Sequence, residues 1–250
     1  GSMVHTILYR VLTTLRDQGR LPPKEGDRAH GLGLVDEVVD QVAAELHDTY
    51  HPAIDRIWRD GVESIRADVR RWMNDTVDAA ILHRVEPWRF ELSFGLGTRT
   101  EQDPDSRAEP MLLPGGLKLR GSIDLVERSG EGNLTATDYK TGKQRAQAGT
   151  RVGGGKALQP ILYSLALEKL FPGATVRGGA LWYCTQAGEF TKVEIPLDAA
   201  AREAATEAIG VVGDALQRGF FPAAPATNEC TYCVFHWVCG PRDQRSAPKK

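Results

Sequence analysis

Hydrophobic positions in the N-terminal third of the chain repeat at the three-to-four-residue spacing of amphipathic helices. A first stripe of such positions runs from Val4 to Leu15, which predicts a helix with one buried face. Two further stripes, within residues 34–46 and 54–72, have the same spacing. We expect these to be core-packing helices, inserted over about residues 33–82, with no chemical motif of their own.

The pattern changes to the alternation typical of β-strands after Trp88. The alternating runs are WRFELSFGL, LKLRGSIDLVE and LTATDYK, separated by turns that contain Gly and Asp or Asn, and they predict a three-stranded meander. Helical spacing returns over Leu158–Leu170, two short strands follow within residues 180–183 and 190–195, and an Ala-rich helix spans about residues 198–217. This order predicts an α/β domain.

Composition limits the class of protein. The chain has 250 residues, of which 41% are hydrophobic and 26% charged, so it can bury a core as one elaborated domain or two small ones. No run approaches the roughly 20 apolar residues of a membrane helix, and no secretion signal is present, so we expect a cytoplasmic protein. The opening Gly1-Ser2-Met3 looks like a cloning remnant, and we expect the natural protein to continue upstream.

Net charge is only −2 and gives no global reason to expect nucleic acid as a partner. Locally, however, no Asp or Glu occurs between Lys140 and Leu167. Basic residues are concentrated in the first part of that stretch: Lys143, Arg145, Arg151 and Lys156. This strip could hold DNA phosphates, or it could be an ordinary solvated basic loop.

Two acids end neighbouring predicted strands. Asp124 lies near the end of one strand, and Asp138 near the end of the next. Residues two apart on a strand share a face, so Asp138 projects together with Lys140, and a hairpin register can bring Asp124 beside them. Two close carboxylates repel each other unless a cation lies between them. The arrangement therefore predicts Mg²⁺ or Mn²⁺, with the carbonyl of Tyr139 as a further oxygen ligand.

Asp-x-Lys alone is also the pattern of a solvated salt bridge, but its surroundings are more specific. Residues 121–124 (GSID) and 138–142 (DYKTG) resemble the core of the PD-(D/E)XK nucleases of the RecB-like group, in which a G-x-I-D strand precedes a D-Y-K-T-G strand. The resemblance implies a restriction-endonuclease-like core with a central mixed sheet flanked by helices. It also implies a metal-dependent nuclease centre built on Asp124, Asp138 and Lys140.

A histidine motif precedes this core. His5 in VHTIL is similar to the N-terminal G-x-x-x-H-x-x-L helix of that family, with Gly1 at the first position, and the resemblance makes it a metal ligand. A histidine beside apolar helix residues can also be merely packed or exposed. His30, at the same offset from Gly26, is a competing candidate. We prefer His5 because the helix around it is better patterned.

Two further motifs occur in the order that the family requires. Glu91 in FELSF resembles the E-x-x-F strand, whose acid lies near the metal or its waters, although an exposed strand Glu is the ordinary alternative. Gln159 and Tyr163 match the Q-x-x-x-Y helix of RecB-like nucleases. Spaced four apart, they share one helix face and are expected to bind the Lys140 region or the DNA backbone as part of the catalytic group.

Three cysteines lie close together near the C-terminus. Cys230, Cys233 and Cys239 have the spacing of ligands to one soft metal centre. They resemble the cluster of AddB-type nucleases, which implies a 4Fe–4S site whose fourth ligand lies upstream of residue 1. A zinc site that uses His236 is the second choice, and Cys184 is expected to be a core residue. We expect the cluster to be structural.

The resemblance extends from His5 to Cys239. We therefore expect a nuclease domain over residues 4–229, a cysteine segment over 230–240 and a flexible tail over 241–250. It implies the nuclease module of a helicase–nuclease that processes DNA ends in recombinational repair, an exonuclease rather than an endonuclease, with a helicase motor fused or as a separate subunit. The alternatives are a non-catalytic DNA-binding module and a zinc-stapled protein-interaction domain.

Overall fold

The structure is a computed structural model of the whole chain. It describes residues 1–98, 100–147, 149, 157–221, 223, 230 and 233–235. Several sequence predictions fall outside these residues: Arg151, Lys156, His236, Cys239 and the tail over 241–250. Contacts along the backbone divide the chain into two units, residues 1–208 and 209–250, and the fold and the site described below belong to the first.

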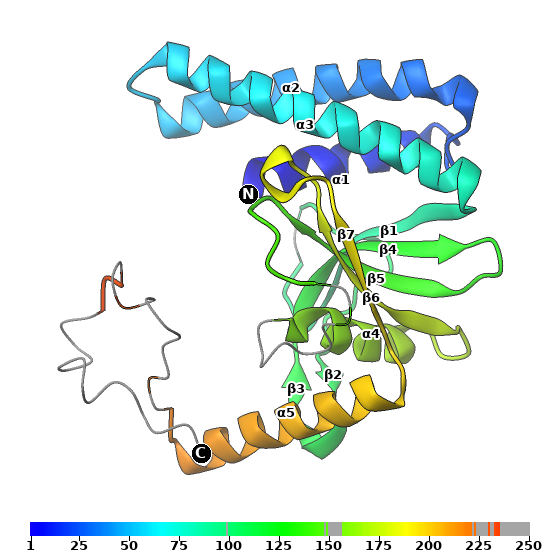
Figure 1. Cartoon of the computed structure of the whole chain (residues 1–250). Coiled ribbons are helices and arrows are strands. Elements are labelled where there is room, and N and C mark those ends of the chain that lie inside the picture. The colour runs from blue at the N-terminus through cyan, green and yellow to red at the C-terminus, as the bar shows by residue number, and fades with distance from the viewer. Residues whose placement is uncertain are drawn as a thin grey trace. The chain divides into compact units, whose positions relative to one another are not determined.

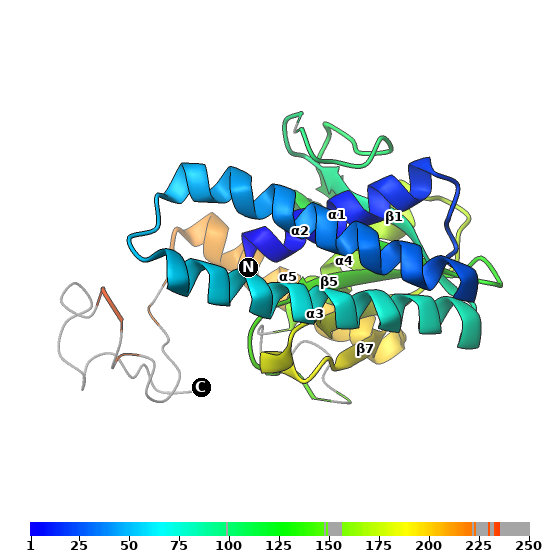
Figure 2. The same ribbon diagram turned by 90° about the horizontal axis from the view of Figure 1, so that it is seen from above.

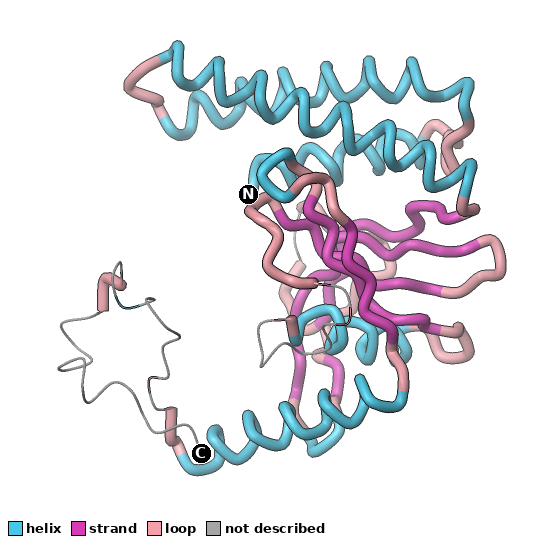
Figure 3. Tube along the Cα trace, in the orientation of Figure 1, coloured by secondary structure: helices cyan, strands magenta, loops and turns pink. Residues whose placement is uncertain are grey.

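A five-stranded mixed sheet forms the centre of the first unit (Figure 3). Its strands, in spatial order, are β1 (Val85–Phe94), β4 (Gly121–Ser129), β5 (Leu134–Lys140), β6 (Val176–Tyr183) and β7 (Lys192–Pro196). Neighbouring strands are antiparallel except for the parallel pair of β5 and β6. The predicted meander and the mixed sheet are confirmed, and helix α4 lies in the connection that a parallel pair requires.

Three helices cover one face of this sheet: α1 (Ser2–Asp17), α2 (Arg28–Tyr50) and α3 (Asp55–Leu82). Figure 1 shows α1 between the sheet and the pair of long helices, α2 and α3. Figure 2 shows α2 and α3 side by side above α1. Most of the predicted stripe positions lie on the buried faces of these helices, which pack with Phe90, Leu125 and Trp182 of the sheet. The start of the third stripe was wrong, because Ile54 and Ile57 are exposed at the beginning of α3, beyond the part of the helix that packs in the core. This packing fixes α1, which carries His5, against the strands.

Helix α4 (Leu158–Leu170) covers the other face of the sheet, together with the first turns of α5 (Ala199–Arg218). The approach of α4 to β6 is close because β6 has a glycine there. A Cβ placed on Gly179 would lie 2.5 Å from the carbonyl oxygen of Pro160, a distance that real atoms do not allow. The absence of a side chain at Gly179 therefore sets the position of the first turn of α4, which carries Gln159.

One predicted strand is divided in the structure. Residues 117–127 were expected to form a single strand, but β3 (Lys118–Leu119) pairs with β2 (Met111–Leu112) in a separate two-stranded sheet. Strand β4 begins only at Gly121. Short 3₁₀ turns complete the described elements: η1 (Glu25–Asp27), η2 (Pro114–Gly116) and η4 (Gln186–Gly188). Among the described helices, none has the length and apolar character needed to cross a membrane.

Candidate active site

The site is formed where β4 and β5 separate. Strand β4 remains paired with β1 as far as Gly121, whereas the pairing of β4 with β5 ends at Leu125 and Thr137. Asp124 and Asp138 are the next residues along the two strands, and we call this point the fork. There, Oδ2 of Asp124 accepts the backbone N–H of Tyr139 at 2.8 Å. The carboxylate thus supplies an acceptor where the strand ladder has ended.

In the edge strand β1, beside the fork, the side-chain alternation is interrupted. Phe90 packs in the core of α1–α3, whereas Leu92 packs in the core of α4, although residues two apart on a regular strand share a face. Their partners on β4, Leu125 and Ile123, divide between the two cores in the same way. Glu91 lies at the change and is left-handed, with φ 49°. Such a backbone costs about 1–3 kcal/mol outside glycine and is commonly found at functional sites.

Three side chains gather at the fork as a potential metal-binding group. Ligand atoms of His5, Glu91 and Asp124 all lie within 4.8 Å of one another, and Nδ1 of His5 is 3.5 Å from Oδ2 of Asp124. Ser122 holds the second acid, because its hydroxyl donates to Oε2 of Glu91 at 2.8 Å. One imidazole and two carboxylates form a donor set that fits a divalent ion such as Mn²⁺.

The electrostatics of His5 reflect these neighbours. Burial alone lowers the pKa of an imidazole, but the hydrogen bond and negative charge of Asp124 raise it, and the charges of Glu91 and Asp138 add to that effect. The net result is that the pKa of His5 is raised above its ordinary value. The acidic neighbours of His5 thus favour positive charge at this place.

Asp138 and Lys140 project together from β5, as the strand alternation predicted. Nζ of Lys140 lies 2.5 Å from Oδ2 of Asp138 and donates to Oε1 of Gln159 at 3.1 Å. Burial, and then repulsion from Asp124, raise the pKa of Asp138, although Lys140 opposes both effects. The amide of Gln159 in turn donates to the hydroxyl of Tyr163 at 3.1 Å. Four of the predicted catalytic residues, Asp138, Lys140, Gln159 and Tyr163, are therefore joined in one chain of contacts.

A glycine allows the Q-x-x-x-Y helix to approach the GSID strand closely. A Cβ on Gly121 would lie 3.0 Å from the hydroxyl oxygen of Tyr163, so the glycine leaves the room that this hydroxyl occupies. Burial raises the pKa of Tyr163, and the nearby backbone of Ser122 opposes that rise. The two motifs, about 40 residues apart along the sequence, thus approach each other closely at Gly121.

A single cavity of about 720 Å³ collects these groups. The sequence-predicted residues that line it are His5, Glu91, Asp124, Asp138, Tyr139, Lys140, Gln159 and Tyr163. The lining residues that the sequence analysis did not assign to the site include Tyr9, Glu101 and Ser122. Ser122 could have been noticed as the variable position of GSID, whereas no periodicity or motif marks the other two.

A comparison with protein-family profiles agrees with this geometry. The profile described as the PD-(D/E)XK nuclease superfamily matches residues 1–240. The chain belongs to the PD-(D/E)XK nuclease superfamily. Members are generally nucleases that use divalent metal ions, and nuclease activity implies a DNA substrate. A search of curated proteins found no match to this chain.

Some residues considered in the sequence lie away from the nuclease cavity. His30 on α2 contacts Oε1 of Gln18 at 2.7 Å and is not among the lining residues, whereas His5 is. Lys143 and Arg145 are exposed in the segment after β5, also outside the lining. Cys184 is buried, as expected of a core residue, and burial raises the pKa of its thiol to about 12.

The cysteine segment lies in the second unit of this nuclease-family chain. Of its three cysteines, Cys230 and Cys233 are described, and the backbone N–H of Cys233 donates to the carbonyl of Cys230 at 3.4 Å. Cys239 and the alternative ligand His236 lie outside the described residues. The metal cluster and its type stay predictions from the sequence.

Proposed function

We propose that this chain is a DNA nuclease that hydrolyses phosphodiester bonds with Mg²⁺ or Mn²⁺, and that it acts as an exonuclease rather than an endonuclease. One observation carries the proposal: the residues of five separate motifs line one cavity at the fork in a chain of the PD-(D/E)XK nuclease superfamily. The RecB-like motif order further supports a nuclease module that works with a helicase motor, as a fused domain or a separate subunit, in DNA end processing and recombinational repair. The proposed cytoplasmic location rests on the composition of the chain.

In this proposal, His5, Glu91 and Asp124 hold the divalent ion, with Asp138 and the carbonyl of Tyr139 as further ligands. The proximity of the first three groups supports these roles. When bound, such an ion polarises the scissile phosphate and lowers the pKa of a water molecule. Imidazole is a softer donor than carboxylate, so the set favours Mn²⁺ over Mg²⁺.

Lys140 stabilises the phosphate or positions the attacking water. Its ammonium group has three N–H donors, and the described contacts direct it to Asp138 and Gln159. The remaining donor is then available to a phosphate oxygen or a water molecule in the cavity. Gln159 has a positioning role, because it accepts from Lys140 and is itself tied to Tyr163.

The basic strip after β5 would bind the DNA backbone outside the cavity. Lys143 and Arg145 are exposed there and follow directly on the strand that carries Asp138 and Lys140, which supports contact with a strand that enters the site. Arg151 and Lys156 complete the proposed strip on sequence grounds.

The cysteine segment would hold a structural 4Fe–4S cluster, with zinc as the second choice. The proposal rests on the spacing of Cys230, Cys233 and Cys239 and on the resemblance to AddB-type nucleases. Elemental analysis distinguishes the two, because an iron–sulfur cluster contains iron with acid-labile sulfide and a zinc site contains neither.

Cleavage of end-labelled single- and double-stranded DNA, in Mg²⁺, Mn²⁺ or EDTA, tests the function. The wild-type chain is compared with Asp138→Ala and Lys140→Ala, and with Lys169→Ala as the matched control. Lys169 is exposed at the far end of α4 and lies outside the cavity lining. Product length against time separates stepwise removal from the end from internal cutting.

The proposal predicts metal-dependent cutting that Asp138→Ala and Lys140→Ala abolish and Lys169→Ala leaves intact. DNA binding without cutting in any metal would contradict it and favour the non-catalytic binding module. Internal fragments as the first products would retain the nuclease but overturn the exonuclease assignment.

A further inference from the structure

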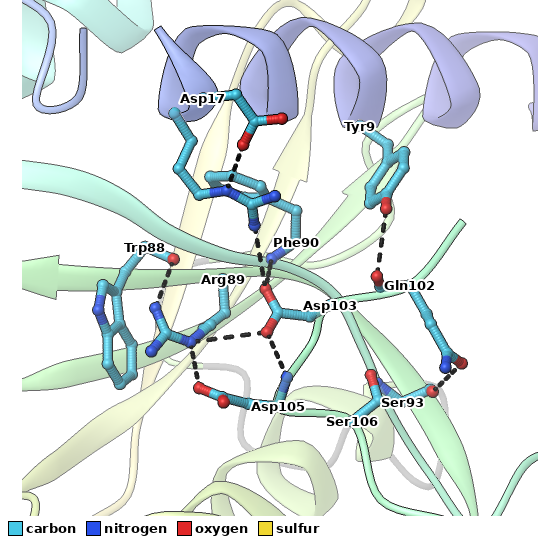
Figure 4. A network of polar contacts seen from close by, with 11 residues as sticks. Tyr9, Asp17, Trp88, Arg89, Phe90, Ser93, Gln102, Asp103, Asp105 and Ser106 are labelled. Carbon is cyan, nitrogen blue, oxygen red and sulfur yellow. Dashed lines mark hydrogen bonds and ion pairs between the residues drawn. The ribbon is translucent and has the colours of Figure 1, made fainter. Parts of the chain in front are cut away.

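A segment of the chain runs along the outer edge of β1, opposite the fork. We call residues 101–107 the edge segment, part of which Figure 4 shows. The backbone N–H of Arg107 donates to the carbonyl of Ser93 at 2.9 Å, and the N–H of Ser93 donates to Oγ of Ser106 at 3.0 Å. The edge segment thus binds the side of β1 that no strand of the sheet pairs with in the described structure.

Asp103 in this segment forms hydrogen bonds to Glu91, whose backbone is left-handed, and to the residue before it. Its backbone N–H donates to the carbonyl of Glu91 at 3.1 Å, and its Oδ2 accepts the N–H of Phe90 at 3.1 Å. Its other oxygen, Oδ1, accepts the N–H of Asp105 at 3.0 Å. One residue therefore fixes the backbone immediately before Glu91 and the carbonyl of Glu91 itself. Figure 4 shows the contacts of the Asp103 carboxylate with Phe90 and Asp105.

The carboxylate of Asp103 is held in a place that is unfavourable for a charge. Asp103 is only 2% exposed, and its nearest guanidinium groups, of Arg89 and Arg16, lie 3.6 and 3.8 Å away. Arg89 is closer to Asp105, at 2.6 Å. Burial raises the pKa of Asp103, and its two N–H contacts oppose that rise. The carboxylate nevertheless accepts two separate backbone N–H groups, those of Phe90 and Asp105.

An asparagine could not make both of these contacts. Its amide has one acceptor oxygen, so its NH₂ group would face the N–H of either Phe90 or Asp105. Asp103→Asn nearly preserves volume and shape, yet it removes one of two bonds: the one to Phe90, directly before Glu91, or the one to Asp105, which shapes the loop that carries residue 103. The Asp103→Asn variant therefore tests whether the Asp103 carboxylate helps to position the Glu91 carboxylate.

We propose that Asp103 is a positioning residue of the metal centre, which fixes the left-handed backbone of Glu91 so that the Glu91 carboxylate lies beside His5 and Asp124. The inference rests on the proposed function, because it assumes that these three residues hold a divalent ion. Asp103 itself is not among the residues that line the cavity, so it acts through Glu91.

Free Mn²⁺ measured by electron paramagnetic resonance gives the dissociation constant of each variant without any need for activity. Asp103→Asn should weaken Mn²⁺ binding about tenfold or more, the size of effect seen for residues that orient metal ligands. Asp105→Asn is the matched control: it removes an acid from the same segment, but its side chain is 47% exposed and paired with Arg89. Its Mn²⁺ affinity should stay within about twofold of the wild type, since it orients no metal ligand.

Circular dichroism and the melting temperature establish that both variants are folded at the temperature of the titration. A folded Asp103→Asn that binds Mn²⁺ as the wild type does, while Glu91→Ala loses binding, would overturn the positioning role and leave the proposed function intact. Failure of the wild type both to bind Mn²⁺ and to cut DNA would overturn both proposals.

If Asp103→Asn does not fold, Ser106→Ala carries the test. It removes the acceptor of the Ser93 N–H in the same edge segment. It should weaken Mn²⁺ binding about threefold, less than the tenfold or more expected where a residue orients a ligand directly. Wild-type Mn²⁺ affinity in a folded Ser106→Ala would contradict the proposal.

Discussion

The ammonium group of Lys140 is oriented by two neighbours of different kinds. Asp138 attracts it with a charge, whereas Gln159 accepts one N–H in a fixed direction and is itself held by Tyr163. Direction is what a group needs to meet a phosphate oxygen or a water molecule, since catalytic efficiency depends steeply on geometry. We therefore expect the uncharged amide to contribute to cleavage.

Gln159→Ala should accordingly lower kcat for DNA cleavage about ten- to a hundredfold, because small misplacements of a catalytic group have effects of that size. The KM for DNA should change much less. Steady-state cleavage kinetics measure both values. Gln18→Ala, which alters an exposed amide bound to His30, is the control, and an unchanged kcat in Gln159→Ala would contradict the positioning role.

Cys184 should be inert to alkylation in the folded chain. Its thiol is buried, and its pKa of about 12 leaves almost no thiolate at pH 8, which is the reactive form. Peptide mapping by mass spectrometry after iodoacetamide treatment measures the labelling at each cysteine. Cys184 should be labelled only after unfolding in denaturant, and equally fast labelling in the native chain would show that the site is not buried as described.

At the scale of elements, the position of α4 depends on the missing side chain of Gly179. A methyl group there would meet the backbone of Pro160, so Gly179→Ala must push the first turn of α4 away from β6. Overpacking of this kind destabilises by about 1–3 kcal/mol. Because Gln159 precedes Pro160, kcat should fall as well.

Urea unfolding and cleavage kinetics test Gly179→Ala. Gly33→Ala on α2 is the control, because an added Cβ there has no neighbour within 4 Å; it should be neutral or stabilising by up to about 1 kcal/mol. Unchanged stability and kcat in Gly179→Ala would mean that α4 is not fixed by this contact.

The elements were largely predictable because each has a local pattern. Apolar stripes mark the helices, alternation marks the strands, and the same alternation places Asp138 and Lys140 on one face. The division of residues 117–127 was not predictable, since β3 leaves the sheet to pair with β2, a tertiary choice. The left-handed backbone of Glu91 and its hydrogen bond with Asp103 were also missed. The two residues meet through the backbone, which no sequence motif marks.

At the scale of the whole molecule, bound metal should stabilise the first unit. The carboxylates of Glu91, Asp124 and Asp138 repel one another in the ion's absence, and a ligand that binds only the folded chain raises its stability. Mn²⁺ at about one hundred times its dissociation constant should contribute about 2.7 kcal/mol, which corresponds to a rise of roughly 5–10 °C in Tm.

Thermal unfolding with and without Mn²⁺ measures that rise. Asp124→Ala should lose most of it, whereas Asp60→Ala, which alters an exposed acid on α3, should keep it. An equal Mn²⁺-induced shift in Asp124→Ala would place the stabilising ion elsewhere in the chain.

In the proposed mechanism, the donors gathered at the fork hold the ion with which this superfamily member cleaves DNA. Diffraction at the manganese absorption edge, from crystals grown with Mn²⁺, tests it most directly. We predict an anomalous peak within about 2.5 Å of ligand atoms of His5, Glu91 and Asp124. No peak at the fork, in a chain that cuts DNA with Mn²⁺, would contradict the account.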